Sequence, residues 1–216
     1  WPLGKNTTNE LIRLNEGPCQ IHNNCSGKHS GFLTLNKFLK SDAEYIDINH
    51  PVQKNILSVF EEMTGESSSG YGIDGCSAPN HATSLKGLAT AMARMGVGVR
   101  GPASLRLVEA MAKYPLLVAG EGRACSELMS AVGGRIVLKT GAEGVYTAIL
   151  PEQGLGIALK IDDGATRGSE CAITALLVRL GLADEKHPMI RKRMFSILKN
   201  ATGLEVGNIR PAECLM

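Results

Sequence analysis

The spacing of apolar residues along this chain of 216 residues changes character once, between residues 135 and 161. Before and after that stretch, apolar residues recur at the spacing of helices that bury one face. These helices are expected over approximately residues 5–17, 26–40, 50–65, 84–95, 102–113, 125–129, 165–181 and 188–199. Inside the stretch the pattern is typical of strands joined by short connections, which predicts a β-meander at 135–140, 145–150 and 156–161. The sequence therefore predicts an α/β or α+β fold.

Residues with local structural roles mark several of the expected ends. Ser26 can cap the helix that follows it, because its hydroxyl can accept a hydrogen bond from a first-turn N–H group. Asn49 is the expected cap of the next helix, with Pro51 in its first turn and Gly65 at its end. Glycine, proline and polar residues gather in three loops, at 67–70, 72–80 and 118–125.

The composition excludes several classes of function. With 44% hydrophobic residues, the chain can bury a core as one domain, or as one domain with a lobe. Its 23 basic and 21 acidic residues nearly balance, so neither nucleic acid nor a membrane surface is an expected partner. The six cysteines are scattered along a chain of medium length without an evident signal peptide. That distribution predicts reduced thiols and a cytoplasmic location.

The densest group of reactive side chains lies in His22–Leu33, at the start of an expected helix. If the helix begins early enough, Cys25, Lys28 and His29 point the same way. A thiol, an ammonium and an imidazole at a helix N-terminus form an electropositive site, a setting that lowers the pKa of a cysteine. The alternative interpretation is a capped helix with solvated polar residues.

Four separated motifs follow one another along the chain: Asn24–His29, Asp74–Cys76, Ala119–Cys125 and Lys139–Gly144. Together and in this order they resemble the motifs of the L-asparaginase II family, the rhizobial or thermolabile-type asparaginases. The resemblance implies hydrolysis of the side-chain amide of L-asparagine to L-aspartate and ammonia. It also implies a fold similar to that of the serine β-lactamases and glutaminases: an antiparallel-rich sheet flanked by helices, with a helical lobe.

The resemblance also implies a Ser-x-x-Lys element and a further serine upstream of the first motif, whereas this chain begins at Trp1. We therefore expect residues 1–216 to be the C-terminal portion of a single asparaginase-like domain. Such a fragment would be inactive alone and would associate with itself or with the missing portion. The alternative is a catalytically incomplete or non-catalytic metal-binding homologue. The only Ser-x-x-Lys present, Ser196–Lys199 on the expected terminal helix, is interpreted as a chance match.

The resemblance guides the choice of catalytic and substrate-binding residues. Amide hydrolysis needs a nucleophile, a base and donors for the developing oxyanion. Lys139 is the candidate base, since a lysine at a strand end before a Gly-rich turn can be partly buried with a lowered pKa. Asp74 can bind the substrate ammonium, and Arg123 can bind the substrate carboxylate through two hydrogen bonds. His29 is assigned to the same substrate site, and Cys125 is expected to be a small buried residue.

Cys25, Lys28 and Cys76 form a candidate zinc site. Thiolates from two separate loops suit Zn²⁺, and a neutral Lys28 amine could join them, with His29 as a further ligand or an orienting group. The two sulfur atoms are expected within about 4 Å of each other. The alternatives are two buried structural thiols, a disulfide, or residues that fix the charged ends of the substrate.

Overall fold

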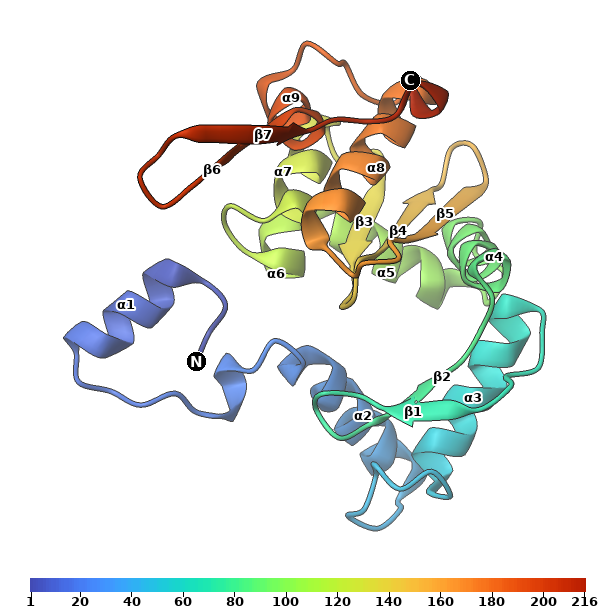
Figure 1. Ribbon diagram of the computed structural model, residues 1–216. Helices are drawn as coiled ribbons and strands as arrows, with labels where there is room; N and C mark the ends of the chain where they lie inside the picture. The colour runs from blue at the N-terminus through green and yellow to red at the C-terminus, as the bar shows by residue number, and fades with distance from the viewer. The chain divides into compact units, whose positions relative to one another are not determined.

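The computed structural model describes residues 1–216, which form two compact units, Trp1–Thr83 and Ser84–Met216 (Figure 1). Both units contain helices and antiparallel strands, which confirms the predicted α+β class. The single asparaginase-like domain stays a prediction. No helix exceeds 14 residues among those of the structure, and none is both long and apolar enough to cross a membrane. Each unit is described by itself.

The first unit combines helices with one short hairpin. Its elements are α1 (Lys5–Arg13), the 3₁₀ helix η1 (Gln20–His22), α2 (Ser26–Leu39), α3 (Pro51–Thr64), β1 (Tyr71–Ile73) and β2 (Pro79–His81). Helix α3 packs against α2 and β2. The hairpin is a correction, because the sequence predicted only a loop at 72–80. Its two strands pair in antiparallel register, with Gly72 opposite Asn80.

The cap of α3 also differs from the prediction. His50, not Asn49, occupies the cap position, and its Nδ1 accepts a hydrogen bond of 3.1 Å from the Val52 N–H. The reason is the proline at position 51, which is the first helical residue, so that the cap falls one residue later than expected. Asn49 instead donates its backbone N–H to the Asp47 carboxylate.

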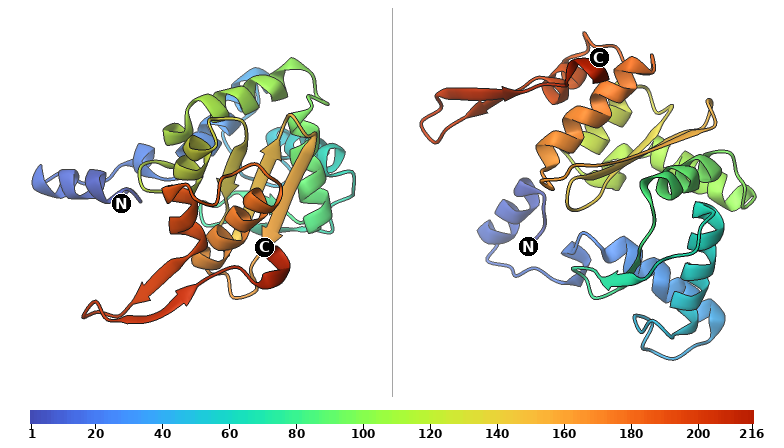
Figure 2. Two further views of the ribbon diagram at one scale, coloured as in Figure 1. Left: turned by 90° about the horizontal axis from the view of Figure 1, so that it is seen from above. Right: turned by 45° about the vertical axis from the view of Figure 1, so that its right-hand side comes forward.

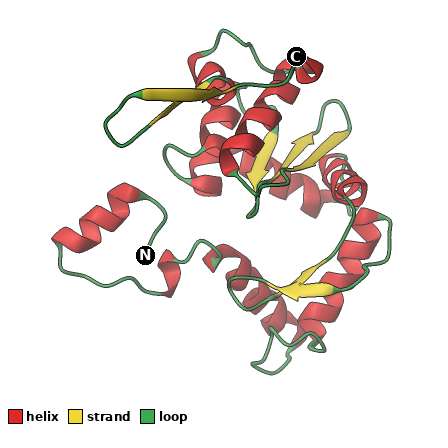
Figure 3. Ribbon diagram, viewed as in Figure 1, coloured by secondary structure: helices red, strands yellow, loops and turns green.

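The second unit contains the predicted meander with helices on both faces (Figure 3). Its helices are α4 (Leu85–Gly96), α5 (Pro102–Lys113), α6 (Pro115–Ala119), α7 (Ala124–Ala131), α8 (Thr166–Arg179), α9 (Pro188–Met194) and the 3₁₀ helix η2 (Glu213–Leu215). The sheet has the order β3 (Val137–Thr140), β4 (Val145–Leu150), β5 (Leu155–Lys160), all antiparallel.

Alternation along the central strand β4 places different helices on its two faces. Ile149 lies against Gly96 of α4, whereas Tyr146, three positions away and therefore on the other face, contacts Cys125 of α7. Tyr146 is completely buried, as are Leu128 and Leu138. The continuous hydrophobic core of the structure lies in this unit, which can therefore bury apolar surface without the first unit.

The end of the chain corrects a second prediction. The expected helix at 188–199 stops at Met194, and Ser196–Lys199 is strand β6, paired with β7 (Glu205–Ile209) in a hairpin that extends away from the helices of its unit (Figure 2). The sequence signal that was missed is the turn between these two strands. The side-chain carbonyl of Asn200 accepts a hydrogen bond from the Leu204 N–H, and Gly203 has a φ of 85°. On a strand, residues three apart face opposite sides, so Ser196 and Lys199 do not form a catalytic pair.

The close approach of α4 to β5 depends on a glycine. A Cβ atom at Gly156 would lie 2.1 Å from the Ala89 carbonyl oxygen and 2.5 Å from the Ala93 nitrogen, both in the backbone of α4. Backbone atoms cannot move aside as a flexible side-chain end can. Gly156 therefore sets the distance between this helix and the sheet.

We predict that Gly156→Ala destabilises the second unit by about 1–3 kcal/mol or more, because the methyl group forces helix and sheet apart. Urea unfolding followed by circular dichroism measures the change. Gly31→Ala is the matched control: its added methyl meets no atom within 4 Å in α2, so it should be neutral or stabilising by up to about 1 kcal/mol. Equal midpoints for Gly156→Ala and the unsubstituted chain would contradict the close packing.

A charged network joins three helices of the second unit. Arg193 of α9 donates from Nε to Glu127 Oε2 of α7 at 3.0 Å and from Nη1 to Glu170 Oε2 of α8 at 2.7 Å. Lys192 donates to the other Glu127 oxygen at 2.8 Å. Burial alone would raise the pKa of Glu127, but hydrogen bonds from Lys192 and Arg193 outweigh it and hold the pKa below its usual value. The carboxylate form therefore stabilises the fold.

We predict that Glu127→Gln lowers the free energy of unfolding at pH 7 by about 1–3 kcal/mol, and that this loss shrinks as the pH falls. The sign follows from the lowered pKa: the stabilisation is present above the unfolded-state value of about 4.5 and is lost as the pH falls through the folded-state value. Urea midpoints between pH 7 and pH 3 test this. Glu185→Gln is the control, since Glu185 makes only an exposed pair with Arg191 at 3.9 Å. A difference independent of pH would rule the linkage out.

Candidate functional site

Three of the predicted residues meet in the first unit. Lys28, in the first turn of α2, donates from Nζ to Asp74 Oδ2 and lies 3.1 Å from Cys76 Sγ. Asp74 and Cys76 belong to the turn between β1 and β2, 46 and 48 residues further along the chain. The structure thus brings together two motifs that the sequence alone leaves separate. We call Cys25, Lys28, Asp74 and Cys76 the Lys28 cluster.

Asp74 organises the turn that carries it. Its Oδ1 accepts hydrogen bonds from the backbone N–H groups of Cys76 (2.9 Å) and Ala78 (3.1 Å), which leaves Oδ2 for Lys28. Burial alone would raise the pKa of the Asp74 carboxyl. The hydrogen bond from Lys28 and those from the turn outweigh burial and hold this pKa far below its usual range. Asp74 is therefore a fixed negative charge.

The Cys76 thiol lies beside a positive charge without being ionised by it. Its sulfur is 3.1 Å from Lys28 Nζ, yet the pKa of Cys76 is raised to about 11. Burial is the main cause, a hydrogen bond with the Cys25 thiol adds to it, and Lys28 opposes it without prevailing. Burial would also lower the pKa of Lys28, but Asp74 and Cys76 outweigh it and raise that pKa. The cluster thus holds an ammonium beside a carboxylate and the neutral Cys76 thiol, and all six cysteines are free.

His29 points to a different neighbour. Its Nδ1 lies 2.9 Å from the Tyr45 hydroxyl, and its ring makes edge contacts with Phe32 and Tyr45. The other ring nitrogen, Nε2, is buried without a hydrogen-bond partner. His29 also lines a pocket of about 540 Å³ in this unit, together with Ser26 and Cys76. Its assignment to substrate binding stays a prediction, as does that of Asp74.

Arg123 and Lys139 belong to the second unit. Arg123 is the cap residue of α7 and is half-buried, and no hydrogen bond or ion pair engages its guanidinium. Lys139 lies on β3, and its Nζ donates to the Thr140 carbonyl at 2.6 Å. Its side chain is exposed, which corrects the expectation of partial burial. The reason is its place near the strand end: Val137, on the same face of β3, is buried, whereas Lys139 lies one residue from the last residue of the strand.

A buried cysteine ties these two segments together. Cys125 accepts a hydrogen bond of 3.2 Å from the Thr140 N–H, and its sulfur lies 3.0 Å from the Tyr146 hydroxyl. Cys125 is 1% exposed, as expected for a small buried residue. Because Thr140 follows Lys139 and Cys125 lies two residues after Arg123, this contact brings both candidate residues to one end of the unit. Sequence reasoning missed Tyr146, whose only signal is its place in an apolar strand.

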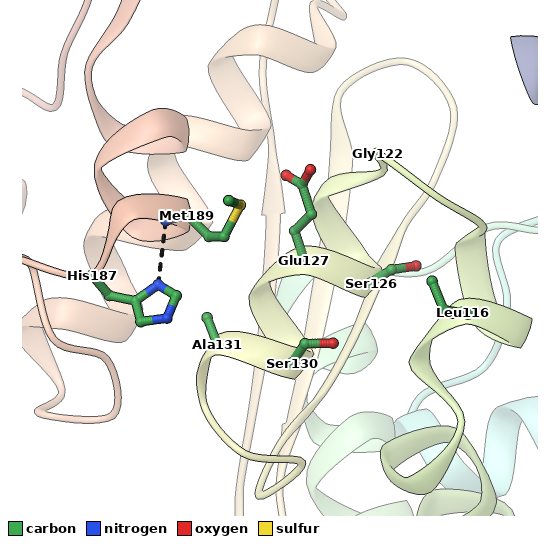
Figure 4. A pocket seen from close by; sticks show the side chains of 8 residues that line it. All are labelled: Leu116, Gly122, Ser126, Glu127, Ser130, Ala131, His187 and Met189. Atoms are coloured by element: carbon green, nitrogen blue, oxygen red, sulfur yellow. Dashed lines mark hydrogen bonds between the residues drawn. The ribbon is translucent and has the colours of Figure 1, made fainter.

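A separate pocket of about 300 Å³ lies between α7 and the start of α9 (Figure 4). Its wall includes Gly122, Ser126 and Glu127, with Met189 facing them from α9. His187 also lines the pocket, and its Nδ1 caps α9 by accepting a hydrogen bond of 3.2 Å from the Met189 N–H. The carboxylate of Glu127 is already held by Lys192 and Arg193, so this pocket offers no free charged group for catalysis.

No group of three or more His, Cys, Asp or Glu side chains has a metal-binding arrangement in the structure. The candidate zinc ligands in the Lys28 cluster are the two thiols and the Lys28 amine, so one of the three donors is of a type outside that group. That set suits Zn²⁺ chemically, since thiolates are preferred zinc ligands. Binding requires the loss of protons from Lys28 and Cys76, because their raised pKa values favour the protonated forms.

Comparison with known proteins identifies the family of this chain. A search of curated proteins returns no match. The family model described as L-asparaginase II, in contrast, matches residues 1–211, which include the Lys28 cluster, the α7 cap and the end of β3. A match over nearly the whole length does not depend on any single short motif, and on this basis the chain belongs to the L-asparaginase II family.

Proposed function

We propose that this protein hydrolyses the side-chain amide of L-asparagine to L-aspartate and ammonia. The family match over residues 1–211 carries the proposal. It is supported by the contact between Cys125 and Thr140, which brings the segments of Arg123 and Lys139 together in the second unit. A small amino-acid substrate also agrees with the nearly balanced charge of the chain.

Arg123 is the proposed partner of the substrate α-carboxylate. A positive side chain at a helix N-terminus is disfavoured by the helix dipole, whereas an anion there is favoured. An unpaired guanidinium at this position therefore gains a matched partner when a carboxylate binds. The guanidinium also has the geometry for two parallel hydrogen bonds to that carboxylate.

Lys139 is the proposed base. In the step assigned to it, its amine takes the proton of a serine hydroxyl as the oxygen attacks the amide carbon. The proton then passes to the leaving nitrogen, so that ammonia departs and an ester to the enzyme remains. Water hydrolyses this ester, which releases L-aspartate and restores the hydroxyl. The serine is that of the Ser-x-x-Lys element which the family resemblance implies.

The Lys28 cluster is the proposed zinc site, with Cys25, Lys28 and Cys76 as ligands. A bound Zn²⁺ would supply a fixed positive charge and a covalent-like link between the start of α2 and the β1–β2 turn. Without it, the Lys28 ammonium supplies the positive charge and pairs with Asp74.

We predict that Lys139→Ala lowers kcat for L-asparagine by about 10²–10⁴-fold, because a positioned base contributes that much to proton transfer. The assay measures ammonia release by the product of the complete reading frame that encodes these residues. Lys160→Ala is the matched control: Lys160 is also an exposed lysine of the same sheet whose Nζ donates to the carbonyl of the following residue.

Equal losses for Lys139→Ala and Lys160→Ala would remove Lys139 from the mechanism. Absence of ammonia release from L-asparagine by the unsubstituted protein, with zinc binding retained, would instead favour a non-catalytic metal-binding module. The Lys28 cluster is the specific observation behind that second candidate function.

We predict that the protein binds one Zn²⁺ with an affinity that rises with pH, because Cys76 and Lys28 must each lose a proton to bind it. Titration calorimetry in buffers of different ionisation enthalpy measures the protons released. Cys76→Ser should weaken binding by at least about tenfold. The control is Cys19→Ser, since Cys19 is an exposed free thiol outside the cluster. Binding that is unchanged by Cys76→Ser would refute the assignment.

A further inference from the structure

Two arginines lie close to the start of α7, and they differ in how they are engaged. The guanidinium of Arg123 has no partner. The guanidinium of Arg193 is fully engaged: besides Glu127 and Glu170, its Nη2 donates to the Gly122 carbonyl oxygen at 2.8 Å. Gly122 directly precedes Arg123. Arg193 therefore holds the peptide group between Gly122 and Arg123, and with it the backbone that carries the unpaired Arg123 side chain.

The segment held in this way has a backbone that needs outside support. Gly120 has φ 89° and Gly122 has φ 69°, conformations that glycine adopts readily and that leave an unanchored loop free to change shape. The Gly120 N–H closes α6 by donating to the Leu116 carbonyl, whereas the carbonyl of Gly122 accepts its side-chain contact from α9. Arg193 is thus a direct constraint on the turn before Arg123.

We propose that Arg193 is a positioning residue for substrate binding: it fixes the 120–123 turn so that the Arg123 guanidinium is held ready for the substrate carboxylate. The inference rests on the proposed function for the identity of that carboxylate. Arg193 itself touches no substrate, because its donors are directed at Glu127, Glu170 and Gly122. Its side chain is only 13% exposed.

The geometry requires an arginine at this position. The planar fork of Arg193 reaches groups from α7, α8 and the 120–123 turn at once, with Nη2 shared between Glu127 Oε2 (2.5 Å) and the Gly122 carbonyl (2.8 Å). Lys192, the neighbouring cation, reaches only the other oxygen of Glu127. A lysine in place of Arg193 keeps the positive charge but lacks the fork that spans the three partners.

The carboxylates of Glu127 and Glu170 would suffice to pair the charge of Arg193 and to join the three helices. The contact of Arg193 with Gly122 adds nothing to that charge balance, since a peptide carbonyl is neutral. This contact instead fixes the 120–123 turn. This separates a positioning role from a purely structural one, and the separation can be measured.

The test compares Arg193→Lys with Arg191→Lys in the product of the complete reading frame. Arg191 is the matched control on the same helix: its guanidinium pairs with Glu185 at 3.9 Å and lies over the Phe195 ring at 5.3 Å, and neither contact reaches the 120–123 turn. We expect Arg193→Lys to raise the KM for L-asparagine about tenfold or more while kcat changes much less, since a turn far from the chemistry misplaces a binding group. Arg191→Lys should change neither constant.

A substrate analogue and a double variant isolate the route through Arg123. 3-Aminopropanamide has the amine and the amide of asparagine but no α-carboxylate, so Arg193→Lys should leave its turnover unchanged. In the Arg123→Met background, Arg193→Lys should raise the KM for L-asparagine no further. A full additional tenfold rise in that background, or an equal loss with both substrates, would overturn the inference.

Hydrogen exchange provides a readout that does not need activity. Arg193→Lys should speed exchange of the backbone amides in 120–124, and Arg191→Lys should not. Unchanged exchange, in a protein that still releases ammonia from L-asparagine, would refute the positioning role alone. Absence of ammonia release by the unsubstituted protein would refute the proposed function, and with it the substrate part of this inference.

Discussion

The arrangement of the second unit depends on how one largely buried charge is compensated. Burying an arginine without partners costs several kcal/mol, and removing one partner of a buried pair leaves that penalty uncompensated. Arg193 avoids it through Glu127 and Glu170, and Lys192 adds a second positive charge at Glu127. Because the partners come from α7 and α8, the compensation is possible only when these helices take their places around α9. The ion pairs therefore specify the arrangement of α7, α8 and α9 more closely than apolar packing alone would.

The charged pair of the first unit is of another kind. The side chains of Lys28 and Asp74 are 36% and 23% exposed, and an ion pair with that access to water contributes about 0–1 kcal/mol. Burial raises the pKa of both Asp74 and Cys76, and Lys28 lowers both, whereas Asp74 adds to the rise at Cys76. A cluster that stabilises little while it gathers two thiols, an amine and a carboxylate is better explained by binding than by folding.

Much of the secondary structure could be predicted because it follows from local periodicity. The meander and α2, α4, α5 and α8 need only the spacing of apolar residues and the glycines and prolines at their ends. The helix expected at 188–199 failed because basic residues and short apolar pairs fit either period, and the Asn200–Gly203 turn that pairs β6 with β7 was overlooked. Contacts between distant segments, such as Arg193 with Gly122, have no local pattern and were not predicted.

The candidate site could be predicted where its side chains also make hydrogen bonds to the backbone. Asp74 uses one oxygen to close its own turn and the other to hold Lys28, so the residue is fixed by both demands and stands out as a motif. Cys125 likewise fills the core and accepts the Thr140 N–H. A substitution at such a residue changes the fold and the site together, which hides its separate roles. Arg193 differs: its contact with the Gly122 carbonyl can be removed while its charge is kept, so positioning and stability become separately measurable at that residue.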